Sequence, residues 1–245
     1  MLLSRRISPL TNQTLISSFS PHPHSLSNLP PKTTSFSIKS FHQTLISPLL
    51  GYINGANKSS QFAHSVWQKL IQKGDTLIDA TCGNGHDTLA LTKMVSTQGG
   101  GWVYAIDIQK SAIDNTTSLL NSNEEEIPKE NVKLFQICHS RMEEIVPKES
   151  VVRVVAFNLG YLPGGDKSII TVPERTLEAL KAASRLVESG GVISVLVYVG
   201  HSGGREEYET VMGFAAGLPV ENWVCSKFEM VNRPLAPVNL FIYKR

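Results

Sequence analysis

The stretch from Leu77 to Thr88 constrains this chain most, because it combines a buried strand, a glycine turn and the start of a helix. The strand ends at Asp79, and Gly83 and Gly85 make the turn. Glycine turns of this kind commonly hold a pyrophosphate on backbone N–H groups at a helix N-terminus, and a carboxylate would repel it. The third glycine of the dinucleotide fingerprint is also replaced, by Thr88. These features argue against a dinucleotide and a nicotinamide oxidoreductase.

The same turn suits a ligand that carries an amino-acid moiety. Asp79 can attract an ammonium group directly or through water, and glycines let the backbone approach closely. S-adenosylmethionine has such a moiety, so we expect it as the cofactor and methyl donor. A plain turn or cap role for Asp79 is the alternative. The residues expected to bind the donor here are Asp79, Cys82, Gly83, Asn84, Gly85 and Asp87.

The N-terminal part has the composition of an organellar transit peptide. Residues 1–74 contain no Asp or Glu, and the first 50 are rich in Ser, Thr and Pro with four scattered basic groups. We therefore expect a transit peptide over residues 1–50 and a single domain over residues 51–245. The chloroplast is the expected compartment, with the mitochondrion as the alternative.

The rest of the chain is nearly neutral, since leaving out those four basic groups leaves 19 Lys and Arg against 21 Asp and Glu, a formal charge of −2. It therefore lacks the overall basic character of a general nucleic-acid binder, and any RNA contact must be local. Three widely separated cysteines favour neither a disulfide framework nor a zinc site. We expect no metal and no membrane span.

Hydrophobic periodicity predicts alternating strands and helices. Strands are expected over residues 76–80, 102–107, 132–137, 151–157 and 192–199, and helices over 61–71, 86–95, 109–120, 173–187 and 205–216. Two further strands, 223–230 and 238–243, follow one another without a helix between them. This order predicts an α/β, Rossmann-like, mostly parallel sheet with an antiparallel C-terminal hairpin at one edge.

Polar side chains stand at the ends of three expected parallel strands: Asp79, Asp107 and Asn158. Ligands of open α/β sheets bind at this edge, so we expect these residues to converge on one crevice. Asp107 lies 22 residues after Gly85, the distance at which an acid meets a ribose. We expect Asp107, helped by Gln109, to bind the adenosine ribose of the donor. Capping of the following helix is the alternative for Asp107.

His139 follows the third strand, where the adenine ring would be flanked by side chains. It is a candidate wall of the donor site, and a purely structural histidine is the equal alternative.

The segment from Asn158 to Lys167 resembles a platform for a flat substrate with an amine. Asn158 Oδ1 and the Leu159 carbonyl can accept from the amine and aim its lone pair at the sulfonium methyl group, while Tyr161 stacks on the base. Asn158 and Leu159 are therefore expected next to the donor as well. The alternative is a Gly/Pro-rich surface loop.

Tyr198 lies at the end of the fifth expected strand and His201 follows it, on the same side of the sheet. Either can contact the substrate or take up a proton, since an alkylammonium must lose one before it can act as a nucleophile. Whether a protein base is needed stays open. Candidate phosphate contacts are Lys167, Arg175 and Arg205, although a solvated surface explains each equally well.

From about Phe62 to Lys244, the chain resembles the rRNA methylase family. The matching motifs are Asp79-Ala80-Thr81, Gly83 through Thr88, Asp107-Ile108-Gln109 and Phe157 through Lys167. The resemblance implies a seven-stranded class I methyltransferase fold with S-adenosylmethionine as donor. It also implies tRNA as partner and N-methylation that completes 5-methylaminomethyl-2-thiouridine at the wobble position of the anticodon loop.

Other functions stay open at this point. The acceptor can instead be rRNA or a small-molecule amine, and the chain can be a noncatalytic RNA-binding factor on a methyltransferase fold. A homodimer is a further possibility.

Overall fold

The computed structural model describes residues 48–245 except 99, 124, 126 and 128. These residues belong to one compact unit. The transit peptide expected over residues 1–50 lies outside the described residues apart from its last three, which are helical together with residues 51–53. The boundary at residue 50 stays a prediction.

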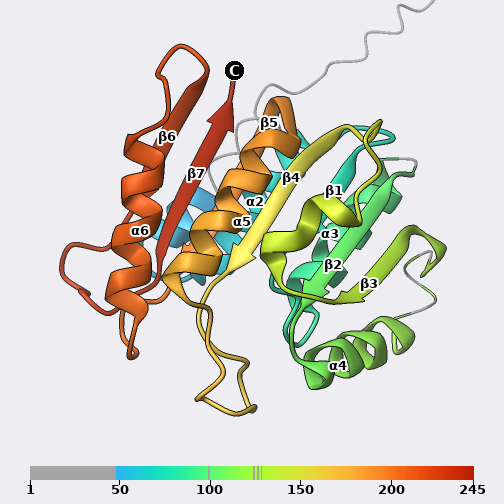
Figure 1. Ribbon diagram of the computed structural model, residues 1–245, viewed down its shortest axis with the longest axis horizontal. Helices are drawn as coiled ribbons and strands as arrows, with labels where there is room; N and C mark the ends of the chain where they lie inside the picture. The colour runs from blue at the N-terminus through green and yellow to red at the C-terminus, as the bar shows by residue number, and fades with distance from the viewer. Residues whose placement is uncertain (1–47, 99, 124, 126, 128) are drawn as a thin grey trace, which may run out of the picture. The chain divides into compact units, whose positions relative to one another are not determined.

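Seven strands form one sheet in the order β3-β2-β1-β4-β5-β7-β6 (Figure 1). Strands β1 to β5 run parallel, whereas β7 pairs antiparallel with β5 and β6. The predicted sheet with its antiparallel C-terminal hairpin is therefore confirmed. The strands are β1 (Thr76–Asp79), β2 (Trp102–Asp107), β3 (Val132–Gln136), β4 (Val152–Asn158), β5 (Val187–Val197), β6 (Trp223–Phe228) and β7 (Val238–Lys244).

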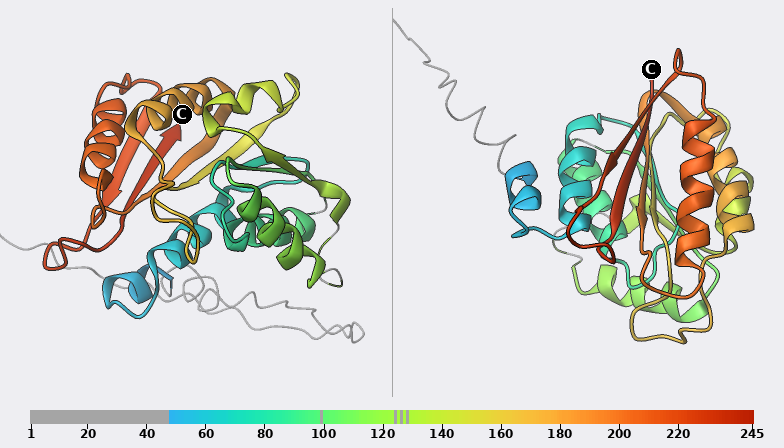
Figure 2. Two further views of the ribbon diagram at one scale, coloured as in Figure 1. Left: turned by 60° about the horizontal axis from the view of Figure 1, so that its bottom comes forward. Right: turned by 90° about the vertical axis from the view of Figure 1, so that its left-hand side faces the viewer.

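Helices cover both faces of the sheet. In Figure 2, α2 and α3 lie on one side of the strands, and α5 and α6 lie on the other. The helices are α2 (Ser59–Leu70), α3 (His86–Thr97), α4 (Lys110–Asn121), α5 (Pro173–Leu186) and α6 (Gly204–Ala216), with short 3-10 turns η1 (Lys129–Asn131) and η2 (His139–Glu144). None of the helices in the described part of the chain combines the length and apolar character needed to cross a bilayer.

Two hydrophobic cores follow from the alternation of side chains along the central strands. Leu77 and Val154 pack in the core beneath α2 and α3. Their neighbours Ile78 and Val155 point the other way, into the core shared with α5 and α6. The β-branched run of β4 is thus buried on both faces, as a central parallel strand should be.

The structure differs from the expected elements in two places. Strand β5 begins at Val187, directly after α5, because the chain turns extended at that residue and pairs with Val152 before a register shift. The stretch after β3 forms the turn η2, which sequence periodicity does not reveal because only His139 and Met142 of its six residues are buried.

The order of the strands places the topological switch between β1 and β4, since the chain leaves β1 toward β2 and returns on the other side as β4. Ligands of open α/β sheets bind outside the carboxyl ends of the strands at such a point. In Figure 1 the loop of residues 159–172 extends beyond that end of β4.

Candidate active site

A cavity of about 470 Å³ opens at the carboxyl ends of the parallel strands. Its volume falls in the range of small-molecule sites. Most of the residues singled out from the sequence line it: Cys82, Gly83, Asn84, Asp87, Asp107, Gln109, His139, Asn158, Leu159, Tyr161, Tyr198 and His201. The expected convergence on one crevice is therefore seen for Asp107 and Asn158.

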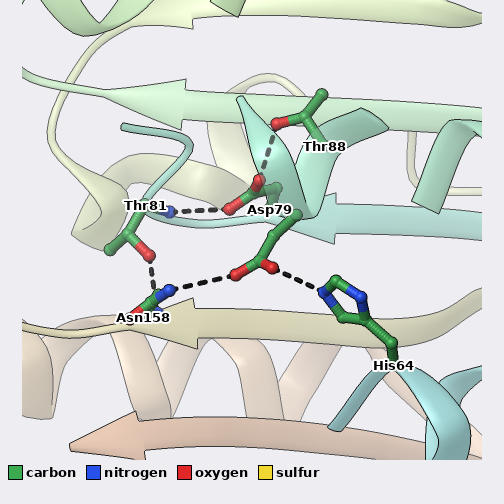
Figure 3. A network of polar contacts seen from close by, with 6 residues as sticks. His64, Asp79, Thr81, Thr88 and Asn158 are labelled. Atoms are coloured by element: carbon green, nitrogen blue, oxygen red, sulfur yellow. Dashed lines mark hydrogen bonds and ion pairs between the residues drawn. The ribbon is translucent and has the colours of Figure 1, made fainter. Parts of the chain in front are cut away.

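Asp79 lies beneath this cavity and does not line it. Its side chain is 1% exposed. Its Oδ2 accepts from Thr88 Oγ1 at 2.6 Å, and its Oδ1 accepts from the Thr81 backbone N–H at 3.2 Å (Figure 3). The carboxylate thus braces the turn between β1 and α3. Of the two ways in which Asp79 was expected to attract the ammonium, directly or through water, the direct contact is not available, because Asp79 does not line the cavity.

The surroundings of Asp79 disfavour its charge. Burial, followed by the negative charge of Asp87, raises the pKa of Asp79 to about 7, and the hydrogen bonds from Thr88 and Thr81 oppose this shift. Asp87, in the first turn of helix α3, does line the cavity. An ammonium group in the cavity would therefore face Asp87.

The two glycines of the turn have different tasks. Gly83 lines the cavity, and its N–H donates to Asp107 Oδ2 at 3.1 Å. Gly85 has a φ of +85° and sits close to Thr116 of α4. A Cβ atom on residue 85 would lie 2.9 Å from the Cα atom of Thr116. Gly85 is thus required for packing, and unlike Gly83 it does not line the cavity.

Asp107 serves both the turn and the cavity. Its Oδ1 accepts from the Gln109 backbone N–H at 2.9 Å, at the start of α4. The N-cap of α4 is Gln109, without a side-chain cap hydrogen bond, so the capping alternative for Asp107 is not seen. The hydrogen bond to the Gln109 N–H instead holds the Asp107 carboxylate at the cavity. Burial raises the pKa of Asp107, and the hydrogen bonds from the Gln109 and Gly83 backbones oppose it. Because it is only partly covered, its carboxylate can still accept from a ribose hydroxyl.

His139 and Cys82 are buried walls of the cavity. Burial lowers the pKa of His139 to about 4, so the ring is neutral at physiological pH. It packs edge-on against Phe157 with ring centroids 5.8 Å apart. Burial also raises the pKa of the Cys82 thiol, which keeps it neutral. Both side chains suit an uncharged ring as neighbour.

Asn158 ends β4 in a fixed orientation. Its backbone N–H donates to Thr81 Oγ1 at 2.7 Å, and its Nδ2 donates to Asp87 Oδ2 at 3.1 Å. The other oxygen of that carboxylate, Asp87 Oδ1, lies 2.6 Å from His64 Nε2. Figure 3 shows this network.

The loop after β4 is anchored at both ends. The Gly160 N–H donates to Thr171 Oγ1, which in turn donates to the buried Glu207 of α6, both at 2.8 Å. On the other side of the cavity, Asn84 Nδ2 donates to the Pro163 carbonyl at 3.0 Å. This loop is therefore a built wall of the cavity. The surface-loop alternative accounts only for its exposed residues.

Aromatic and basic side chains gather on this wall. Tyr161 is 39% exposed and packs edge-on against His201, with centroids 5.9 Å apart. Lys167 Nζ lies 5.7 Å from the Tyr161 ring centroid. Burial raises the pKa of Tyr198, which disfavours a phenolate there. His201 Nδ1 lies 2.8 Å from the Ser202 carbonyl, whereas its Nε2 is buried and has no partner among the described residues.

The other two basic candidates differ in position. Arg175 lines the cavity and pairs with Glu178 at 2.8 Å. Arg205 does not line the cavity and lies over the ring of Tyr208, 5.7 Å from its centroid. Arg175 is thus the better placed of the two for a phosphate near the cavity.

Sequence reasoning missed three residues of this site. Thr81 and Thr171 bridge separate segments through hydroxyl groups, and His64 reaches Asp87 from α2. Pattern alone does not reveal such long-range contacts. The sequence offers only that His64 lies three residues before Trp67, on the same side of the expected helix.

The donor set of the cavity fits S-adenosylmethionine, because it offers a carboxylate at the end of β2, buried neutral walls and a second carboxylate at the glycine turn. Among the described residues, no cluster of three or more His, Cys, Asp or Glu is arranged to hold a metal ion.

Comparisons with known proteins identify the family of this chain. The family described as "Putative rRNA methylase" matches residues 103–244. A protein of Arabidopsis thaliana named "tRNA (mnm(5)s(2)U34)-methyltransferase, chloroplastic" is 56% identical over 222 residues, which cover 89% of this chain and 80% of the relative.

Two solved bacterial structures are also similar. The "putative rRNA-methylase" from Clostridium thermocellum has 35% identity and a TM-score of 0.69, covering 77% of this chain and 98% of its own. SMU.1697c, a "putative methyltransferase" from Streptococcus mutans in complex with SAH, has 30% identity and a TM-score of 0.67, covering 77% of this chain and 99% of its own. This chain therefore belongs to the rRNA methylase family and has the fold of the S-adenosylmethionine-dependent class I methyltransferases.

Proposed function

We propose that this protein transfers a methyl group from S-adenosylmethionine to the side-chain amine of 5-aminomethyl-2-thiouridine at the tRNA wobble position. The observation that carries the proposal is that Asp107, Asn158 and Tyr161 line one cavity. Asp107 can bind the ribose of the donor, Asn158 can accept a hydrogen bond from the substrate amine, and Tyr161 can stack on the base. The product is 5-methylaminomethyl-2-thiouridine.

The residues of the cavity position the two substrates. Asp107 accepts from the donor's ribose, and His139 and Cys82 border its adenine. Asp87 faces the ammonium of the donor, in the role first expected for Asp79. When bound, S-adenosylmethionine supplies the electrophilic methyl group.

The platform residues act on the acceptor. Asn158 Oδ1 and the Leu159 carbonyl accept from the amine, which leaves its lone pair free to attack, and Tyr161 stacks on the base. The amine must react uncharged. His201 is the better candidate to take up the proton, because burial disfavours the phenolate of Tyr198 whereas His201 Nε2 has no described partner.

The compartment follows from two independent features. Residues 1–50 have a transit-peptide composition, and the Arabidopsis relative carries the word chloroplastic in its name. We therefore place the protein in the chloroplast. A fluorescent fusion of the first 50 residues that entered mitochondria instead would contradict this.

The substrate is tested with the purified protein, S-adenosylmethionine and three acceptors: tRNA carrying 5-aminomethyl-2-thiouridine, the same tRNA without the aminomethyl group, and rRNA. Nucleoside mass spectrometry should detect a methyl group only on the first. Methylation of rRNA alone would favour rRNA as the substrate, as the name of the family states. Binding of S-adenosylmethionine without methylation of any RNA would favour a small-molecule amine as acceptor.

Calorimetry of S-adenosylmethionine binding tests the alternative of a noncatalytic RNA-binding factor, since such a factor would not bind S-adenosylmethionine.

The homodimer stays a prediction. Light scattering coupled to size-exclusion chromatography tests it.

A further inference from the structure

Helix α2 precedes the first strand of the sheet, yet one of its side chains enters the network of the active site. His64 Nε2 lies 2.6 Å from Asp87 Oδ1, and Asp87 Oδ2 accepts from Asn158 Nδ2 at 3.1 Å (Figure 3). Asp87 and Asn158 line the cavity, and His64 stands behind them without lining it. Three elements, α2, α3 and β4, thus meet in one line of hydrogen bonds.

The chemistry of the three groups fixes the direction of each hydrogen bond. A carboxylate only accepts, so His64 Nε2 donates to Asp87, and Asn158 must present its NH₂ group to the other oxygen. This arrangement turns Asn158 Oδ1 away from Asp87. Within the described ranges, no protein hydrogen bond to Oδ1 accompanies those made by the Asn158 N–H and Nδ2, which leaves Oδ1 for a donor in the cavity.

His64 itself is held in place by packing. Its ring lies against Trp67, with centroids 4.8 Å apart, and Trp67 is buried. The helix is anchored to the sheet by Phe62, which packs edge-on against Phe241 of β7 with centroids 5.6 Å apart. The side chain of His64 is 25% exposed to solvent, so it is not enclosed on all sides. The contact with Trp67 and the hydrogen bond to Asp87 therefore set its position.

We propose that His64 is a positioning residue, which fixes the Asp87 carboxylate and through it the amide of Asn158, so that Oδ1 faces the acceptor amine. The terminal torsion of an asparagine is broad and roughly two-fold, so an amide without this restraint would also present NH₂ to the amine. An NH₂ group repels an amine's hydrogens and competes for its lone pair. The inference rests on the proposed function for the role of Asn158.

The kinetic test compares substitutions of His64 with the control Gln68→Ala. Gln68 is exposed and lies one turn further along α2. His64→Ala should lower kcat about tenfold to a hundredfold through misorientation of the amide. The KM for tRNA should change little, and the Kd for S-adenosylmethionine should change less than kcat, because the negative charge of Asp87 stays at the cavity. His64→Gln should recover much of kcat, because its amide nitrogen can donate to Asp87. In an Asp87→Ala background, His64→Ala should cost nothing further, since the two act as one unit.

His64→Leu repeats the test with the packing against Trp67 retained, in case His64→Ala does not fold. A kcat equal to that of the wild type in both His64→Leu and His64→Ala would overturn the inference. A loss of kcat that His64→Gln does not relieve at all would also overturn it, because it would indicate packing alone.

A second readout does not depend on methyl transfer. The side-chain amide signal of Asn158 in ¹H–¹⁵N NMR spectra, assigned by its loss in Asn158→Ala, should shift in His64→Leu and stay in place in Gln68→Ala. If the wild type leaves 5-aminomethyl-2-thiouridine unmethylated, the proposed function is wrong and this signal alone decides about His64. An Asn158 signal that is the same in His64→Leu and in the wild type would contradict the network.

Discussion

At the scale of single residues, the two strand-end acids of the site have separate tasks. Asp79 is fully buried and accepts from Thr81 and Thr88, so it holds the shape of the turn. Asp107 accepts from Gly83 and Gln109 and still lines the cavity. Both were expected at the ligand because both end a strand. The strand-end position alone does not tell which way a carboxylate points.

Asp107→Ala should weaken binding of S-adenosylmethionine by about 1 to 3 kcal/mol, because a charged acceptor of the ribose is lost. Isothermal titration calorimetry measures the Kd. Asp114→Ala is the matched control, since this acid lies on the exposed face of α4 in an ion pair with Lys110. An unchanged Kd in Asp107→Ala would rule out the ribose contact.

Asp79→Asn should change how stability depends on pH. Burial raises the pKa of Asp79 from 3.8 to about 7 in the folded protein, so between these values the unfolded chain releases a proton that the folded protein keeps. The contribution of Asp79 is therefore full below about pH 4 and is lost as the pH rises through about 7. The free energy of unfolding of the wild type should fall relative to Asp79→Asn over that window.

Urea unfolding at about pH 5 and about pH 8 tests this difference. His139, whose pKa burial lowers to about 4, acts in the opposite direction but is common to both proteins, so it cancels. Parallel pH dependences for the two proteins would show that Asp79 has an ordinary pKa.

At the scale of elements, the loop of residues 159–172 depends on a chain of hydrogen bonds into the helices. Thr171 Oγ1 accepts from Gly160 and donates to Glu207, which also accepts from Thr176 Oγ1 at 2.5 Å. Glu207 is fully buried and burial raises its pKa. A loop held by so few buried groups should be sensitive to the loss of one.

Thr171→Val keeps the shape of the side chain but leaves the Gly160 N–H and one oxygen of Glu207 without a partner. It should lower the free energy of unfolding by about 1 to 3 kcal/mol, the usual cost of a buried unsatisfied group. Denaturant unfolding measures this. Thr117→Val, at an exposed site on α4, is the control and should change stability little. Equal stabilities of the two variants would contradict the anchoring role of Thr171.

Much of this architecture was predictable from the sequence, because hydrophobic periodicity and glycine turns are local signals. They locate the strands to within about two residues, apart from β5, which begins at Val187 and not at residue 192, and they place Asp107 and Asn158 at one crevice. The contact of His64 with Asp87 joins residues that are 23 positions apart, and it depends on how α2 packs against α3. No local pattern encodes such a tertiary contact, and the same holds for Thr81 with Asn158.

At the scale of the whole molecule, the switch between β1 and β4 explains why one cavity can serve two substrates. Strand β2 brings Asp107 from one side, and β4 brings Asn158 and its loop from the other. In the proposed function, the donor and the acceptor amine approach from opposite sides of the same sheet edge.

A crystal structure of the protein with S-adenosylhomocysteine would show where the donor lies relative to Asp107 and Asn158. The ribose hydroxyls should contact Asp107, the adenine should lie beside His139, and the sulfur should face Asn158. A ligand bound with its ribose away from Asp107, or with its sulfur directed away from Asn158 and the loop after β4, would contradict the account.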